Sequence, residues 1–333
     1  MSDKRILDII VSPADLKLLS NEELSILAGE IRQEIVATTS KTGGHVASSL
    51  GAVEIILALH SLLDCPKDKI VFDVGHQAYA HKLVTGRLKD FGTLSTYGGL
   101  SGFPKPSESP YDVHYSGHAS ASLSVALGLA EARDLAGADQ KVVALIGDAA
   151  LSGGMAFEAL NNIGQAQTPM VIILNDNEMS ISRNVGALAR YLGEKRASRE
   201  YTRTRDSVQS VLEASGPLGR GLVDLGRNAK DSFKQMVIPG EMLFEKLGIT
   251  CTAPIPGHDI AALKRALRVC LEADGPTLLH VVTKKGKGYE PAEENPSKFH
   301  GIGPYDIATG EVKKGSSSAP KYTSVFSKAI VAE

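Results

Sequence analysis

One stretch, residues 142–182, constrains the fold more than any other part of the chain. It begins with an apolar, mostly β-branched run, 142–146, which is typical of a buried parallel strand. Small residues follow Asp148, an amphipathic helical pattern starts at Met155, and a second apolar run covers 170–174. A strand, a helix and a second strand in this order predict one βαβ unit.

Each strand of this unit is followed by a polar turn. Asp148 follows the first strand and Asn177 the second, and open α/β sheets bind ligands at the carboxyl ends of parallel strands. A carboxylate and an amide carbonyl suit Mg²⁺ or Ca²⁺. The small residues beside Asp148, which include Ala149 and Ala150, suit a diphosphate at the start of a helix. Either polar residue alone is more typical of a cap or turn, but the pair favours a ligand site.

Composition limits the classes of partner. The chain has 333 residues, 43% of them hydrophobic, and a net charge of −2, so no basic surface indicates nucleic acid. The amino terminus lacks a signal-peptide core, and no apolar run reaches the ~18 residues of a membrane span. The cysteines lack metal-binding spacing, which favours free thiols. We therefore expect a cytoplasmic protein that binds neither nucleic acid nor membrane.

Gly-rich turns present three histidines. His45 follows a Gly-Gly pair, and His76 follows a short apolar run, 70–74, that predicts another buried strand. The pair Gly117 and His118 precedes a helical pattern. At the amino end of a helix the imidazolium is disfavoured, so a neutral His118 suits hydrogen bonding or proton transfer.

Other segments give weaker signals. The helix predicted after His118 has a small-residue face that permits close packing, formed by Ala121, Val125 and Gly128. The run 277–282 predicts a further buried strand, and Lys285 in the loop behind it could pair with a phosphate, although exposed lysines are more often solvated. The Arg-rich part of 190–234 is interpreted as a solvated segment rather than a patch that attracts phosphorylated substrates. Strands alternating with helices predict an α/β fold with a doubly wound, mainly parallel sheet flanked by helices.

Five stretches in order resemble the 1-deoxy-D-xylulose-5-phosphate synthase family, which belongs to the transketolase-like thiamine-diphosphate enzymes. They are 142–182 with its GDA and NDN turns, GGHVASSLGAVEIILALH (43–60), DVGHQAYAHKLVTGR (73–87), GGLSGFPKPSESPYD (98–112) and TKKGKGYEPAEENPSKFHGI (283–302). The resemblance implies a diphosphate-binding domain over residues 1–312. The composition of 313–321 predicts a linker, and the resemblance implies that 322–333 begin a pyrimidine-binding domain.

The resemblance implies thiamine diphosphate and Mg²⁺ as cofactors and suggests roles for particular residues. The implied metal ligands are Asp148, Asn177 and Met179. The implied cofactor contacts are His76, Gly117, His118, Ala119, Ala149, Ala150, Asn177 and Tyr289. The implied catalytic residues are His45, His118 and His300.

Three residues depart from the family pattern. Ala119 stands where the family has the serine of Gly-His-Ser, and Pro256 stands where it usually has Asp. Ala149 replaces the second glycine of Gly-Asp-Gly and adds a Cβ close to the expected diphosphate. Such a methyl group fits only if the φ angle of Ala149 stays negative.

In such enzymes a pyrimidine-binding domain supplies the Glu that activates the cofactor, and we expect this chain to hold half of an active site. With that domain or subunit in trans, it would condense pyruvate with glyceraldehyde 3-phosphate, releasing CO₂ and forming 1-deoxyxylulose 5-phosphate for isoprenoid precursors. A homodimer is expected from the resemblance. Two alternatives stay open: the amino-terminal subunit of a split transketolase, and a non-catalytic cofactor-binding paralogue, which the three departures support.

Overall fold

The computed structural model describes residues 5–179, 184–197, 243–313, 320 and 322–332. Most of the Arg-rich segment and of the predicted linker therefore lies outside the described residues. Within the described ranges, no helix combines the length and the apolar character needed to span a membrane.

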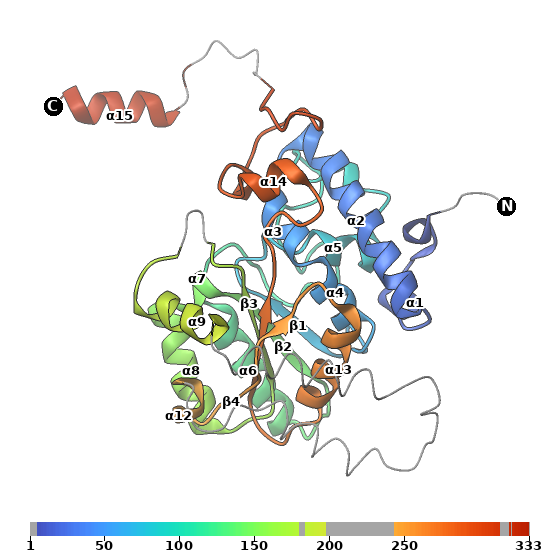
Figure 1. The fold of residues 1–333 in the computed structure, drawn as a ribbon, viewed down its shortest axis with the longest axis vertical. Coiled ribbons are helices and arrows are strands. Elements are labelled where there is room, and N and C mark those ends of the chain that lie inside the picture. Colours follow the sequence, from blue (N-terminus) through green and yellow to red (C-terminus); the bar gives the residue numbers. More distant parts are fainter. Residues whose placement is uncertain (1–4, 180–183, 198–242, 314–319, 321, 333) are drawn as a thin grey trace.

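A parallel sheet forms the centre of the molecule (Figure 1). Its strand order is β1-β2-β3-β6-β4, with β5 also paired to β6, and every pair is parallel. This arrangement confirms the predicted mainly parallel sheet. The strands are β1 (Lys69–Phe72), β2 (Val142–Gly147), β3 (Val171–Asp176), β4 (Thr250–Cys251), β5 (Ile255–Pro256) and β6 (Thr277–Val282).

Alternate residues of the central strands point into two separate cores. On β2, Val143 and Leu145 join one buried cluster, whereas Val142, Ala144 and Ile146 join the other. Because successive side chains of a strand point to opposite faces, the sheet is covered on both sides. This confirms that helices flank the sheet, as the sequence predicts.

Each face has its own set of covering elements. The first core is built with η1 (Ile6–Ile9), α1 (Pro13–Leu16), α2 (Asn21–Thr42), α3 (Val46–Gly51), α4 (Val53–His60), α5 (Tyr79–Lys82), η2 (Leu83–Arg87), η3 (Phe91–Thr93), α13 (Ile260–Leu271), α14 (Glu290–Glu294) and η4 (Lys298–His300). The second is built with α6 (Ser122–Leu135), α7 (Asp148–Leu151), α8 (Gly154–Ala166), α9 (Ala187–Ala197) and α12 (Leu243–Lys246). The last helix, α15 (Tyr322–Ala332), has no buried residue and lies apart from the other elements (Figure 1).

Close helix packing occurs at a different glycine from the one predicted. Gly128 on α6 is exposed, and an added Cβ would meet no atom within 4 Å, so the prediction of close packing there is wrong. The buried face of α6 is formed by Leu123, Ala126, Leu127 and Ala130 instead. On α8, a Cβ at Gly164 would lie 1.8 Å from the backbone oxygen of Leu247, so this site requires glycine.

These two glycines give a matched pair of substitutions. Gly164→Ala should lower the free energy of unfolding by about 1–3 kcal/mol, because the methyl group overlaps a backbone oxygen. Gly128→Ala should raise it by about 0.5–1 kcal/mol, because alanine favours an exposed helix position. Urea unfolding of both variants measures the difference, and equal effects at the two sites would contradict the packing described for α8.

Candidate active site

Two polar turns lie side by side because β2 and β3 pair in parallel. Gly147 at the end of β2 is in register with Asn175 near the end of β3. Asp148 follows β2, and its Oδ2 accepts hydrogen bonds from the backbone N–H groups of Asn177 at 3.3 Å and Glu178 at 2.8 Å. The structure thus brings together the two turns that the sequence singled out.

A cavity of about 330 Å³ opens above these turns. Most of the residues expected in the site line this cavity, although they come from segments far apart in the sequence. The expected residues in its wall are His76, Asp148, Ala149, Ala150, Ala119, Asn177, Met179 and His300. The wall also includes Lys285 and Asp73, for which no firm role was predicted.

Carboxylates give one side of the cavity its charge. Burial, and then the neighbouring carboxylate of Asp176, raise the pKa of Asp148 to about 7. Asp176 is itself fully buried, and its Oδ2 lies 2.8 Å from Nε2 of His280 on β6. Two carboxyl groups held this close favour the arrival of a cation.

The oxygen atoms beside Asp148 and Asp176 determine which type of cation fits the site. Met179 donates its backbone N–H to Oδ1 of Asn177 at 3.1 Å, which orients the amide. No group of three or more His, Cys, Asp or Glu side chains that could hold a metal occurs among the described residues. A cation here would therefore rely on one or two carboxylates plus amide and backbone oxygens, a set that suits Mg²⁺ completed by water or phosphate oxygens.

Three imidazoles form another side of the site. The ring centroids of His45, His76 and His300 lie 5.2–5.8 Å apart. Burial is the main cause that lowers all three pKa values, to about 3 for His76 and about 4 for His300, so the rings are neutral at pH 7. Nδ1 of His76 is buried and has no hydrogen-bond partner among the described residues, which indicates a place for a ligand donor or acceptor.

Lys285 is a site residue whose burial the sequence does not reveal. The sequence favours a solvated lysine, but the residue is only 5% exposed and lies in the cavity wall. Its Nζ is 3.1 Å from Nδ1 of His300, and burial lowers its pKa to about 8. Only the folded loop could show this, because nothing in the local sequence separates Lys285 from its exposed neighbour Lys284.

Gly117 and His118 lie outside the cavity wall. The prediction that His118 stands at a helix terminus is wrong: α6 starts at Ser122, and His118 is exposed. The reason is Asp73, whose buried carboxylate accepts the backbone N–H groups of Ser120 at 2.9 Å and Ser122 at 3.1 Å. This long-range cap takes the place of a local one, and a cofactor contact or catalytic role for His118 stays a prediction.

Tyr289 is also set apart from the cavity wall. Its hydroxyl donates to the backbone oxygen of Ile307 at 2.8 Å, and its ring packs against Phe299 and Tyr305. The residue therefore serves the aromatic core in this structure, and its implied contact with a cofactor stays a prediction.

The structure accommodates the extra methyl group of Ala149. The residue lies within α7, and it is not among the described non-glycine residues with a positive φ. The condition under which alanine replaces glycine without backbone strain is therefore met.

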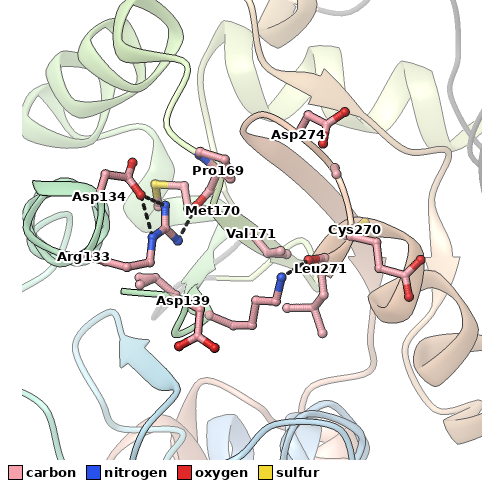
Figure 2. A pocket seen from close by; sticks show the side chains of 13 residues that line it. Arg133, Asp134, Asp139, Pro169, Met170, Val171, Cys270, Leu271 and Asp274 are labelled. Carbon is pink, nitrogen blue, oxygen red and sulfur yellow. Dashed lines mark hydrogen bonds and ion pairs between the residues drawn. The ribbon is translucent and has the colours of Figure 1, made fainter. Parts of the chain in front are cut away.

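A second cavity, of about 380 Å³, lies near the amino ends of β2 and β3. Figure 2 shows the residues that line it. Its wall includes Val142 and Val171 at the amino ends of their strands. Arg133 there pairs with Asp134 and donates to the backbone oxygen of Pro169 at 2.9 Å. Although this cavity is larger, it lacks the buried carboxylates and imidazoles of the first, so we place the site at the carboxyl ends of the strands.

The raised pKa of Asp148 predicts that the free energy of unfolding depends on pH. A carboxyl group whose pKa is raised on folding stabilises the fold below its unfolded value, near 4, and this contribution is lost as the pH rises through about 7. In EDTA, the free energy of unfolding should therefore fall over this range, by about 1.4 kcal/mol for each unit of the Asp148 shift at most. Asp148→Asn should flatten the curve, and parallel curves for both proteins would contradict the raised pKa.

Comparison with known proteins identifies the family of the chain. A sequence model of the 1-deoxy-D-xylulose-5-phosphate synthase family matches residues 7–283. Synthases from Pelotomaculum thermopropionicum and Lachnoclostridium phytofermentans are 51% and 52% identical over 98% of the chain, which covers 51% and 52% of their lengths. The chain thus spans about half the length of these relatives.

A solved structure shows the same fold. The transketolase of Campylobacter jejuni aligns with a TM-score of 0.61 at 20% identity, over 91% of this chain and 45% of its own. The synthase relatives and the family match together decide the classification. The chain belongs to the 1-deoxy-D-xylulose-5-phosphate synthase family.

Proposed function

We propose that the chain is the diphosphate-binding half of a thiamine-diphosphate-dependent synthase that forms 1-deoxyxylulose 5-phosphate. The observation that carries this proposal is the cavity that joins Asp148 and Asn177 to His76 and His300, with the ring of His45 beside both of these imidazoles. Its position at the carboxyl ends of β2 and β3, and the membership of the family, support the same conclusion.

The residues present fit the expected cofactors. Mg²⁺ would be held by the Asp148 carboxylate, the Asn177 amide oxygen and an oxygen of Met179. The diphosphate would lie along Ala149 and Ala150 and face Gly153, the N-cap of α8, whose helix dipole favours an anion. When bound, thiamine diphosphate would supply the nucleophilic carbon needed for chemistry at the carbonyl group of a 2-oxo acid.

Side chains of this chain would bind and orient the substrate and exclude water from the site. His45, His76 and His300 are neutral, so each can donate a hydrogen bond at one ring nitrogen and accept one at the other, which suits the binding and orientation of polar ligand groups. Phe103, with its ring centroid 5.4 Å from that of His45, helps to exclude water. The substrates under this proposal are pyruvate and glyceraldehyde 3-phosphate.

A second domain or subunit completes the site in this proposal. The relatives are about twice as long as this chain, and the whole of α15 is exposed. We therefore propose residues 1–312 as the diphosphate-binding domain, 313–321 as a linker and 322–333 as the start of a pyrimidine-binding domain. The Glu that activates the cofactor would come from that second domain, and assembly as a homodimer in the cytoplasm is part of the same proposal.

Thermal unfolding with added cofactor tests the proposal. Thiamine diphosphate with Mg²⁺ should raise the melting temperature, because a ligand at a hundredfold excess over its Kd stabilises the native state by about 2.7 kcal/mol. EDTA or Asp148→Ala should abolish the rise, whereas the control Asp139→Ala, at an exposed carboxylate paired with Lys67, should keep it. A rise that survives both EDTA and Asp148→Ala would contradict the proposed site.

Ala149→Gly tests whether the departure from the family pattern matters. Because the methyl group already fits a helical backbone, we expect the Kd for thiamine diphosphate to change by less than about threefold. The free energy of unfolding should fall by about 0.5–1 kcal/mol, the cost of glycine in a helix. Calorimetric titration measures the Kd, and a tenfold tighter Kd in the variant would show that Ala149 impairs binding.

A further inference from the structure

We propose that Lys285 is a positioning residue that fixes the tautomer of His300, so that the ring carries its hydrogen on Nε2. Nζ of Lys285 lies 3.1 Å from Nδ1 of His300, within hydrogen-bond distance. This inference goes beyond the proposed function, because it concerns two side chains of the ligand-free protein.

The chemistry of the two groups leaves one arrangement. An ammonium group has three N–H donors and no lone pair, so it can only donate. A neutral imidazole has one nitrogen that donates and one that accepts. If Nδ1 of His300 accepts from Lys285, then the hydrogen of the ring is on Nε2.

The surroundings maintain the charge states that this arrangement needs. Burial, followed by the positive charge of Lys285 and the ring of His45, lowers the pKa of His300 to about 4, so the ring is neutral at pH 7. The pKa of Lys285, lowered by burial to about 8, leaves the amine mostly protonated at pH 7. The charge of Asp148, at the end of β2, favours that ammonium.

The loop that carries Lys285 is held on both sides of this residue. The backbone N–H of Lys284 donates to Nε2 of His258 at 2.8 Å, and Nδ1 of His258 lies 3.0 Å from Oε2 of Glu54. The backbone N–H of Gly286 donates to the oxygen of Ala47 at 2.8 Å. Lys285 therefore approaches His300 from a fixed backbone, unlike a surface lysine that samples many rotamers.

A fixed tautomer determines what His300 can recognise. With Nδ1 occupied, Nε2 is the nitrogen left for other partners in the cavity, and it is an N–H donor. Such a donor suits the oxygen of a carbonyl or carboxylate group, the acceptors that a 2-oxo acid presents. Only this last consequence rests on the proposed function.

The test is the protonation pattern of the His300 ring nitrogens in the protein labelled with ¹⁵N-histidine. A long-range ¹H–¹⁵N correlation spectrum at pH 7, without ligand, should show Nδ1 unprotonated and Nε2 protonated, with His300→Gln identifying the signals. Lys285→Met should lose this single-tautomer pattern. Lys285→Arg should restore it, because a guanidinium group is also only a donor.

Lys284→Met is the matched control, since this neighbouring lysine is exposed and pairs with Glu293 rather than with His300. It should leave the pattern unchanged. A protonated Nδ1 in the unmodified protein would overturn the proposal, whether or not the variants fold. A folded Lys285→Met protein that keeps the pattern would also overturn it. Because no cofactor is present, failure of the proposed function would leave this readout intact.

Discussion

The parallel pairing of β2 and β3 is the constraint on which the site depends. Its register places Asp148 beside the turn after β3, where the carboxylate accepts two backbone N–H groups. The same pairing buries Asp148 near Asp176; burial, and then repulsion from Asp176, raise the pKa of Asp148 to about 7. The hydrogen bonds that shape the site thus come with an electrostatic cost to the ligand-free fold. A bound cation would relieve the repulsion between the two carboxylates, and this relief would add to its binding free energy.

A second set of buried groups holds the loop over 98–112, which carries Phe103. Arg87 contacts Asp112 at 2.7 and 3.0 Å, and that carboxylate also accepts the backbone N–H of Lys105. His81 completes the cluster at 2.8 Å from Asp112, which agrees with the structural role that its burial implies. The loop over 98–112 is therefore held by the buried guanidinium group of Arg87 and the buried ring of His81, and this loop carries Phe103 to its contact with His45. Removing either partner of such a pair would leave a buried charge uncompensated.

How far the sequence predicts the site depends on the range of the interactions involved. The βαβ unit and the meeting of Asp148 with Asn177 were predictable, because both follow from hydrophobic periodicity within one continuous stretch. The place of His118 was not, because Asp73, which follows β1, caps α6 at Ser122. The burial of Lys285 was not predictable from the sequence either. It depends on contacts that the flanking backbone makes with residues distant in the sequence.

The polar groups of the cavity differ in charge. The acidic pair lies where β2 and β3 end, whereas Lys285 comes from the loop after β6 and contacts the neutral imidazole of His300. The positive charge of Lys285 favours anions, while Asp148 and Asp176 favour a cation. A metal-bound diphosphate carries both features, so one ligand can compensate both halves of the cavity.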